Sequence, residues 1–402
     1  MVALYWIAFA LAWLIALAWT RVTLTALRHL PRIPSLLDPR ITARLTSVTR
    51  NSSPEISLTV ILPARNEGAA IESTLRSLLA QTIPLEVIAV DDRSTDETGD
   101  LLERIAAEPL PPGKFLKVLH VAELPAGWMG KTHAMALAAR QAGTRWLLFT
   151  DADILFAPDV LERALLFAHD SGADHVPLAL TLTLKTAGER FMTTVIQAFT
   201  LFTFRPWKIA DPDAKRDSVG VGGFNLIRAD VYRAIGGFEA LRLEVLEDLR
   251  LGYEVKRHGY RQNMVFGRDL IRVHWAAGAL GMAHNLTKNF YAVFRFRPAP
   301  LVAFVLGFVL LLCAPFAALF APWLIRAAGL VALVMIVLGH RYSSRHFTGI
   351  PLLYVLTLPA GALMLAYSML RSMVLTLHRG GVVWRGTFYP LHELRRHCGP
   401  LR

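Results

Sequence analysis

The chain has 402 residues, of which 54% are hydrophobic and 18% are charged. This length exceeds one ordinary domain, and this apolar fraction excludes a purely soluble protein. The net charge of +12 is compatible with nucleic-acid binding, but the sequence contains no signature of a nucleic-acid-binding module, so we expect no nucleic-acid partner. The two cysteines, Cys313 and Cys398, exclude a disulfide framework.

The apolar excess lies at both ends of the chain. Val2 to Trp19 contains no charged residue and is long enough to cross a bilayer. Because no basic segment precedes it and no small-residue cleavage site follows it, we favour an uncleaved anchor over a signal peptide. We therefore expect an N-terminal transmembrane anchor over residues 1–20 and a basic linker along the membrane surface over residues 21–54.

The central region, residues 55–275, alternates between short apolar runs and segments with helical spacing. The apolar runs predict buried strands at residues 58–62, 85–90, 116–121 and 147–149. Strands that alternate with helices over about a hundred residues predict an α/β fold, in which a mostly parallel sheet has helices on both faces.

Polar clusters follow three of these strands, at the edge where open α/β sheets bind ligands. Asp91 and Asp92 follow the second strand and can accept hydrogen bonds from a base or a ribose hydroxyl. Lys131 begins a helix, where it can neutralise a diphosphate or can simply be a solvated loop lysine. Asp151 and Asp153 follow the fourth strand, where they form either a divalent-cation site or an ordinary polar turn.

The second half of the central region contains a glycine-rich segment and an acidic helix start. The glycines of Gly220–Gly223 and Gly236–Gly237 allow either close approach of a ligand to the backbone or tight turns. Glu247 and Asp248 open a predicted helix that reaches about His258. They can supply a general base for transfer chemistry, or they can only stabilise the positive end of the helix.

Taken together, these motifs resemble glycosyltransferase family 2. The motifs are PARNE after the first strand, VDDRSTDET after the second, GWMGK before the third helix, TDAD after the fourth strand and the later Glu-Asp pair. They cover roughly residues 57–260 in the order that the family has them. The resemblance implies a GT-A fold, which is Rossmann-like, and a nucleotide-diphosphate sugar as donor.

The resemblance also implies roles for individual residues. Pro63, Arg65 and Glu67 are expected to line the nucleotide pocket, and Asp91 to contact the uracil or ribose with Asp92 beside it. The remaining expected roles are diphosphate binding by Lys131, binding of Mn²⁺ or Mg²⁺ by Asp151 and more directly Asp153, and general base catalysis by Asp248 with Glu247 as its neighbour.

One departure from the family bears on the product. Processive polymerases of the family carry a Gln/Arg-x-x-Arg-Trp gate motif after the acidic helix, whereas residues 288–297 read KNFYAVFRFR. This favours transfer of a single sugar. The motif variants and the anchor arrangement look like the hopanoid-associated and carotenoid-type bacterial glycosyltransferases, so we expect a lipid or other amphiphilic acceptor.

The C-terminal third predicts further membrane segments. We expect an amphipathic interfacial segment over residues 276–298, transmembrane helices over 299–377 and a basic tail over 378–402. Arginines that flank the spans place the central domain in the cytoplasm of a multi-pass inner-membrane protein. Three spans after a cytoplasmic domain would leave the arginine-rich tail outside, which conflicts with the same rule.

The sequence thus predicts a membrane-bound, inverting, metal-dependent glycosyltransferase that transfers one sugar, with a UDP-sugar as the favoured donor. Two alternatives remain from the sequence. One is a processive polysaccharide synthase, and the other is a catalytically silent GT-A scaffold within a membrane complex.

Overall fold

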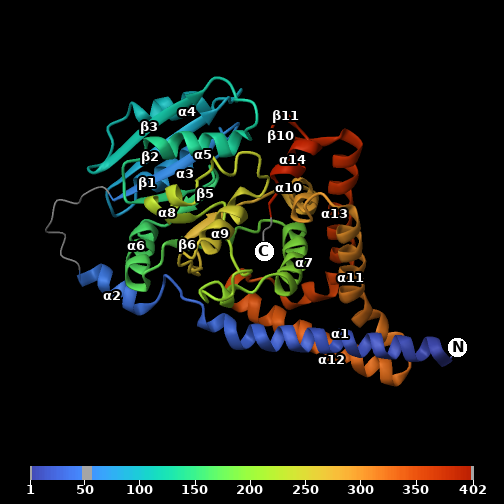
Figure 1. Cartoon of the computed structure of the whole chain (residues 1–402). Coiled ribbons are helices and arrows are strands. Elements are labelled where there is room, and N and C mark those ends of the chain that lie inside the picture. Colours follow the sequence, from blue (N-terminus) through green and yellow to red (C-terminus); the bar gives the residue numbers. More distant parts are fainter. Residues whose placement is uncertain (1, 48–56, 400–402) are drawn as a thin grey trace. The chain divides into compact units, whose positions relative to one another are not determined.

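The computed structural model describes residues 2–47 and 57–399 (Figure 1). These residues form two compact units. The helical unit contains residues 1–32, 183–205 and 274–391, and the sheet unit contains residues 33–182, 206–273 and 392–402. Residues 1, 48–56 and 400–402 are not described, so part of the predicted linker and the end of the predicted tail lie outside the described residues.

A six-stranded sheet with the order β3-β2-β1-β4-β8-β6 organises the sheet unit. The first four of these strands pair in parallel, and β8 pairs antiparallel with both β4 and β6. All seven residues of β1 are buried, as expected for a strand covered on both faces. The strands are β1 (Leu58–Ala64), β2 (Leu85–Asp92), β3 (Lys114–Val121), β4 (Trp146–Phe149), β6 (His175–Pro177) and β8 (Asn225–Arg228).

Helices follow the strands as the alternation in the sequence predicts. A smaller sheet of β5 (Ile154–Phe156), β9 (Ile271–Val273) and β7 (Thr181–Leu182) completes the unit. The predicted α/β class with a mostly parallel sheet is confirmed. The helices are α2 (Pro39–Ser47), α3 (Ile71–Leu79), α4 (Thr98–Ala106), α5 (Gly130–Gln141), α6 (Val160–Ser171), α8 (Ala229–Ala234) and α9 (Glu247–Arg257), while α14 (Leu391–His397) begins at the last residue of the helical unit.

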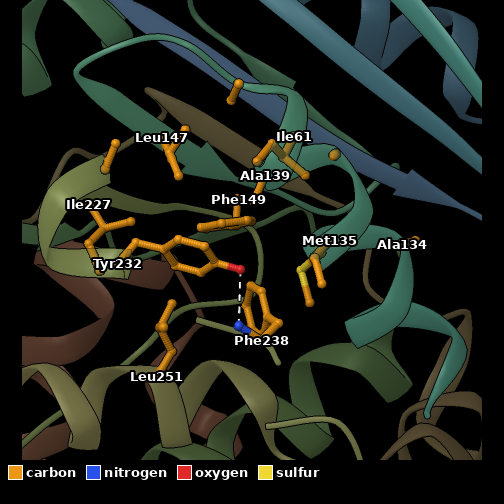
Figure 2. Close-up of a cluster of buried hydrophobic side chains, with 14 of the residues drawn as sticks. Ile61, Ala134, Met135, Ala139, Leu147, Phe149, Ile227, Tyr232, Phe238 and Leu251 are labelled. Carbon is orange, nitrogen blue, oxygen red and sulfur yellow. Dashed lines mark hydrogen bonds between the residues drawn. The ribbon is translucent and has the colours of Figure 1, made fainter. Parts of the chain in front are cut away.

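One hydrophobic cluster joins α5 and α9 to the sheet (Figure 2). The sheet contributes Phe149, α5 contributes Met135 and α9 contributes Leu251, all of them less than 5% exposed. Phe149 packs edge-on against Phe238 with 4.9 Å between ring centroids. Burying a side chain of this size stabilises the fold by roughly 1.5–3 kcal/mol. The shared core fixes the first turns of α5 and α9 relative to the sheet.

Part of the predicted linker is folded onto the sheet unit. The Leu36 N–H donates to the carbonyl oxygen of Phe266 at 2.8 Å. Arg163 of α6 donates to the Leu36 carbonyl oxygen at 3.1 Å and to Thr42 Oγ1 of α2 at 2.9 Å. Residues 33–47 therefore have fixed partners, which a composition rich in proline, serine and arginine does not reveal.

The helical unit contains four stretches that are long and apolar enough to cross a membrane by length and composition: Val2–Arg32, Pro298–Phe320, Trp323–Thr348 and Leu352–Arg379. Apolar helices at both ends of the chain are thus confirmed. Figure 1 shows α1 beside α12, and Thr23 of α1 donates to the Met335 carbonyl oxygen at 3.3 Å. The helices are α1 (Val2–His29), α7 (Ala187–Thr203), α10 (Gly278–Val293), α11 (Pro298–Ala317), α12 (Trp323–Ser343) and α13 (Leu358–Arg379).

The aromatic segments at α7 and α10 form part of the helical unit's core. Phe199 of α7 makes edge contacts with Phe290 of α10 and with Phe304 and Phe308 of α11, at centroid distances of 5.7–6.1 Å. These rings pack against one another, as aromatic side chains within a protein core do.

Candidate active site

The loops after β1 and β2 are joined by hydrogen bonds. The Asn66 N–H donates to Ser94 Oγ at 3.0 Å, and the Thr95 N–H donates to Asn66 Oδ1 at 2.8 Å. Asn66 and Arg93 adopt φ values of 55° and 58°, a left-handed conformation that asparagine tolerates better than arginine. The reciprocal hydrogen bonds hold both loops in this conformation, at the carboxyl edge of the sheet.

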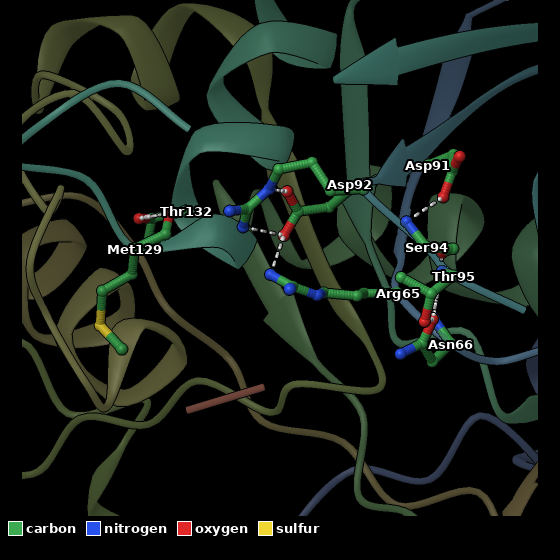
Figure 3. Close-up of polar contacts among 9 residues, drawn as sticks. Arg65, Asn66, Asp91, Asp92, Ser94, Thr95, Met129 and Thr132 are labelled. Atoms are coloured by element: carbon green, nitrogen blue, oxygen red, sulfur yellow. Dashed lines mark hydrogen bonds and ion pairs between the residues drawn. The ribbon is translucent and has the colours of Figure 1, made fainter. Parts of the chain in front are cut away.

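Asp92 lies against the first turn of α5 (Figure 3). Arg93 Nε contacts its carboxylate at 2.8 Å, and Arg65 Nη1 lies 4.0 Å away. A Cβ atom added to Gly130 would lie only 2.2 Å from Asp92 Oδ2, so only glycine fits at this position. The Gly-Lys dipeptide thus begins α5 with glycine because a carboxylate approaches the positive end of the helix there.

Asp91 is held by two donors on the other side of β2. Its Oδ1 accepts a hydrogen bond from the Ser94 N–H at 3.1 Å, and its Oδ2 lies 3.2 Å from His120 Nδ1. The second ring nitrogen of His120 lies 2.8 Å from Glu103 Oε1. The hydrogen bond with Glu103, together with Asp91 and against a smaller effect of burial, raises the pKa of His120 above its ordinary value.

The turn between β4 and β5 presents the Asp-Ala-Asp motif. Thr150 Oγ1 donates to the Gly223 carbonyl oxygen at 2.9 Å, and Thr74 Oγ1 donates to the Ala152 carbonyl oxygen at 2.9 Å. Both bonds fix the backbone on which the two aspartates sit. Burial, reinforced by the charges of Asp151 and Glu67, raises the pKa of Asp153 to about 6.

Lys131 joins this turn to the acidic helix. Its Nζ lies 2.6 Å from Asp151 Oδ1 and 2.6 Å from Glu247 Oε1. Burial alone would lower the pKa of Lys131, but the carboxylates of Asp151, Glu247 and Asp248 outweigh it and raise the pKa above its ordinary value. Lys131 is therefore a permanent cation among three acids that come from two distant parts of the chain.

Asp248 faces the same space. Burial, followed by the negative charge of Glu247, raises the pKa of its carboxyl above the ordinary value. A Cβ atom added to Gly222 would lie 2.9 Å from Asp151 Oδ2, 3.4 Å from Asp248 Oδ2 and 3.7 Å from Lys131 Nζ. Gly222 therefore lies where the turn after β4 and the first turn of α9 converge, and its missing side chain lets both carboxylates approach its backbone.

The other glycines have structural roles. A Cβ atom at Gly220 would lie 1.8 Å from the Asp248 carbonyl oxygen, and one at Gly252 would lie 2.1 Å from the Val219 carbonyl oxygen. Residues 219–220 thus run directly along α9. Gly236 and Gly237 have φ values of 86° and 54° and form a tight turn after α8. Of the two interpretations that the sequence allows, a tight turn applies to Gly236 and Gly237, whereas Gly220 packs against the backbone of α9.

The first turns of α5 and α9 are also linked through the loop before α9. The Met129 N–H donates to the Arg242 carbonyl oxygen at 2.8 Å, and Thr132 Oγ1 donates to the same oxygen at 2.7 Å. These contacts set the position of Lys131 relative to Glu247. The distance between the two residues is therefore fixed by backbone as well as by side chains.

The structure brings together Lys131, Asp151, Glu247 and Asp248, with Asp153 two residues along the same turn. Asp91, Asp92 and Arg65 lie at the ends of the neighbouring strands, and Pro63 is buried within β1, where it pairs with Val90. Glu67 donates its N–H to Thr98 Oγ1 at 2.8 Å. All ten predicted site residues belong to the sheet unit.

Sequence reasoning did not identify Arg93 or His120 as parts of this region. Arg93 adjoins the predicted Asp pair, but nothing in the sequence indicates that it folds back onto Asp92. His120 is the last residue but one of β3, the strand without a recognised polar cluster. In the register of β2 and β3, His120 pairs with Asp91. Aligning the ends of these two predicted strands would therefore have been the one signal in the sequence that places His120 beside Asp91.

The donor set fits a divalent cation only in part. Among the described residues, no group of three or more histidine, cysteine, aspartate or glutamate side chains converges on a metal position. Two carboxylates on one turn do match what Mg²⁺ or Mn²⁺ uses when substrate phosphates complete the coordination. Asp151 and Asp153 would hold such an ion, and Asp151 would exchange its contact with Lys131 for it.

Comparisons with known proteins match the part of the chain that contains most of the sheet. The sequence profile described as "Glycosyl transferase family 2" matches residues 59–236. Two relatives are 4,4'-diaponeurosporenoate glycosyltransferases of Staphylococcus aureus strains RF122 / ET3-1 and MRSA252. Each is 28% identical over 199 residues, which cover 49% of this chain and 50% of the relative. The chain thus spans about half the length of the curated relatives it matches.

Two solved structures align with most of the chain at low identity. The mannosyltransferase PcManGT from Pyrobaculum calidifontis, in complex with GDP-Man and Mn²⁺, has a TM-score of 0.47 at 20% identity, covering 89% of this chain and 99% of that chain. TarS 1–349 of S. aureus, in complex with UDP, has a TM-score of 0.39 at 15% identity, covering 83% and 96%.

The sheet unit is an α/β domain with its acidic cluster at the carboxyl edge of a mostly parallel sheet. Residues 59–236 match the model of glycosyltransferase family 2.

Proposed function

We propose that the protein is a membrane-bound, inverting glycosyltransferase. It transfers a single sugar from a nucleotide-diphosphate sugar, with a UDP-sugar as the favoured donor, to a lipid or another amphiphilic acceptor. The observation that carries this proposal is the contact of Lys131 with both Asp151 and Glu247. It joins the carboxylates expected on the donor side to those expected on the acceptor side in one cluster.

In this proposal Asp248 is the general base. It takes the proton from the acceptor hydroxyl while the acceptor oxygen forms a bond to the anomeric carbon of the sugar. The bond from that carbon to the diphosphate breaks, and its electron pair leaves with the diphosphate oxygen. Attack opposite the leaving group inverts the anomeric configuration. The raised pKa of Asp248 supports this role, because a base is most effective when its pKa lies near the working pH.

Lys131 stabilises the negative charge that develops on the leaving diphosphate. It starts from contacts with Asp151 and Glu247, so one cation neutralises the acids before the donor binds and the diphosphate afterwards. A divalent ion held by Asp151 and Asp153 would supply further Lewis-acid stabilisation of the diphosphate when bound. Asp91, Asp92 and Arg65 at the neighbouring strand ends would hold the nucleoside.

A lipid acceptor is supported by two observations. The described residues include four helices apolar and long enough to span a membrane. The relatives from S. aureus are named for the glycosylation of 4,4'-diaponeurosporenoate, which is an amphiphile of the carotenoid type. We propose the inner membrane as the location, with the sheet unit in the cytoplasm. The arginines that flank the predicted spans support this orientation.

The proposal is tested with membranes that contain the protein at a high level. They are incubated with radiolabelled UDP-glucose, UDP-N-acetylglucosamine and GDP-mannose in separate reactions, and the lipid extract is separated by chromatography. We expect one donor to label a discrete lipid species that carries one sugar, and membranes with the Asp248→Asn variant to lack it.

Two outcomes would contradict the proposal. Label in a long polymer would indicate a processive synthase instead. Tight nucleotide binding without transfer of label to any fraction from any donor would indicate a catalytically silent scaffold.

A further inference from the structure

The segment His392–Gly399, here called the tail segment, belongs to the sheet unit and not to the helical unit that precedes it. Leu394 is fully buried, and Cys398 is only 8% exposed. The Cys398 N–H donates to the Leu394 carbonyl oxygen at 2.8 Å, which continues the last turn of α14. A basic tail beside a membrane would be expected to remain in solvent, so this burial needs a partner surface.

That partner surface flanks the acidic pair of α9. The Gly399 N–H donates to Glu244 Oε2 at 3.3 Å, three residues before Glu247. A Cβ atom at Gly399 would lie 2.1 Å from Arg250 Nη1 and 2.2 Å from its Cζ. The backbone of Gly399 therefore lies directly on the guanidinium group of Arg250, two residues after Asp248.

Arg250 is itself fixed. Its guanidinium pairs with Glu254 at 2.5 Å and lies 4.9 Å from the ring centroid of Tyr253, and the residue is only 9% exposed. Glu244 is 3% exposed. The tail segment thus contacts two buried residues on either side of Glu247 and Asp248, and any movement of it is transmitted to the first turn of α9.

We propose that the tail segment positions the helix that carries the base candidate, and that the chain therefore returns to the side of the membrane where the sheet unit lies. The first part rests on contacts within the sheet unit. The second rests also on the membrane insertion that the proposed function includes. A segment that packs on the sheet unit must share its compartment.

This return requires an even number of membrane crossings between the sheet unit's Val273 and the tail segment. Three apolar helices, α11, α12 and α13, lie in that interval, so one of them does not cross. The same requirement resolves the conflict in the sequence, because the arginine-rich tail then lies on the side that the positive-inside rule assigns to it.

The helices α11 and α12 have the features of a hairpin that crosses and returns. The turn between them carries no charge. Its residue Phe320 is 91% exposed, and the adjoining Trp323 is 73% exposed. At the other ends lie basic residues: Arg295 and Arg297 before α11, and Arg341 and Arg345 at and after the end of α12. No aspartate or glutamate occurs between Asp269 and Glu393.

The helix α13 has the features of one that packs on protein. In the apolar 18-residue window of the stretch that contains it, 44% of the residues are buried, against 33% in the corresponding windows of the stretches that contain α11 and α12. Its buried residues include the hydroxyl-bearing Ser368, Ser372 and Thr376. Ser372 Oγ accepts a hydrogen bond from the Tyr291 N–H of α10 at 2.9 Å, and Arg371 donates to Thr287 of the same helix at 3.2 Å. We therefore assign α13 as the non-crossing helix.

Thiol labelling in the full-length chain tests the docking of the tail segment. Replacing Cys313 with alanine leaves Cys398 as the only thiol. We expect Cys398 to react slowly with a maleimide. Gly399→Trp, which forces the backbone off Arg250, should raise the labelling rate at least tenfold and lower kcat at least tenfold while nucleotide affinity stays within twofold. His397→Trp is the matched control, because His397 is an exposed neighbour in the same segment.

Unchanged labelling and kcat in Gly399→Trp would overturn the positioning role. If that variant does not accumulate, Leu394→Ala provides the same readout, because it loosens the segment without adding bulk. Equal losses of kcat and nucleotide affinity would indicate a general loss of structure, which also contradicts a specific role in placing α9.

Single cysteines in a chain that lacks both native ones test the crossings. They are placed at Lys117 on the sheet unit, at Phe320 in the α11–α12 turn and at Arg396 in the tail segment, all of which are exposed. An impermeant maleimide is applied to sealed inverted and right-side-out vesicles. We expect the cysteines at positions 117 and 396 to react from one face and the cysteine at 320 from the other.

Labelling of positions 117 and 396 from opposite faces would overturn the assignment. This readout does not depend on catalysis. A chain that transfers no sugar but labels as expected would contradict the proposed function and leave the topology standing.

Discussion

Lys131 Nζ lies 2.6 Å from Glu247 Oε1, and this ion pair joins the first turn of α5 to the first turn of α9. The two residues are 116 positions apart (247 − 131 = 116). Both helices rest on one hydrophobic cluster that they share with the sheet. The site is thus assembled from helix ends whose positions the core determines, and Lys131 meets the acids of both segments only when both helices are in place.

Lys131→Gln should remove the positive charge that these acids share. Asp151, Glu247 and Asp248 would lose their common cation, so we expect a lower melting temperature, weaker nucleotide binding and a loss of transfer of at least a hundredfold. Thermal unfolding, calorimetry with UDP and initial rates measure the three effects. Lys117→Gln, a change at an exposed lysine of β3, should alter none of them. Wild-type unfolding and turnover in Lys131→Gln would remove Lys131 from the site.

Asp153→Ala tests the proposed metal. Asp153 is not part of the apolar core, so the variant should fold, as measured by circular dichroism, while transfer is lost. EDTA should abolish transfer by the unaltered protein, and Mn²⁺ or Mg²⁺ should restore it. Sustained transfer in excess EDTA would show that Lys131 provides the needed positive charge without a metal.

Asp248→Asn and Glu247→Gln together test the base. General base catalysis contributes about 10²–10⁴-fold in rate, so Asp248→Asn should transfer at least a hundredfold more slowly with nearly unchanged nucleotide affinity. Glu247→Gln should act differently. It breaks the pair with Lys131 and should lower stability more than it lowers kcat. If Glu247→Gln is the inactive variant and Asp248→Asn transfers normally, the base is Glu247.

Gly222→Ala tests whether the space beside the acidic cluster is needed. The added Cβ would lie 2.9 Å from Asp151 Oδ2, so the carboxylate must shift or the substrate must lose room. We expect kcat to fall at least tenfold with a melting temperature within about 2 °C of the unaltered protein. Gly143→Ala is the control, because nothing lies within 4 Å of a Cβ there. Equal activity in both variants would contradict a role for this space.

The pairing of His120 with Glu103 and Asp91 predicts a dependence of stability on pH. The raised pKa of His120 means that the folded protein holds this proton more tightly than the unfolded chain does. The stabilisation is complete below the unfolded pKa, near 6.5, and is lost as the pH rises through the higher folded pKa. His120→Gln should therefore lower the melting temperature at pH 5.5 more than at pH 8.5. An equal difference at both pH values would show that the ring contributes no charge.

Several elements could be predicted from single stretches of sequence because local patterns specify them. The apolar run of β1 is fully buried in the structure. The apolar run before Asp-Ala-Asp predicts a strand that is followed by a polar turn. The helices at both ends have a length and composition that only a membrane or a large core accommodates. The class of the domain follows from the alternation of these elements.

The role of each glycine could not be read in this way. Gly220 and Gly222 are two residues apart, yet one packs on the backbone of Asp248 and the other faces the side chains of Asp151 and Asp248. The difference depends on where α9 lies, and residues almost thirty positions later in the chain determine that. A sequence motif gives the type of residue but not the neighbour that requires it.

The sequence by itself determined the α/β class, the apolar helices and the set of acidic and basic residues at the ends of strands and helices, because periodicity and residue type act over a few positions. The tertiary structure alone decided that Lys131 contacts Asp151 and Glu247, that Asp92 faces Gly130 and that the tail segment packs beside α9. These contacts join residues that are distant in the chain. Only the shared hydrophobic core, which fixes α5 and α9 against one sheet, brings the elements that carry them close enough to interact.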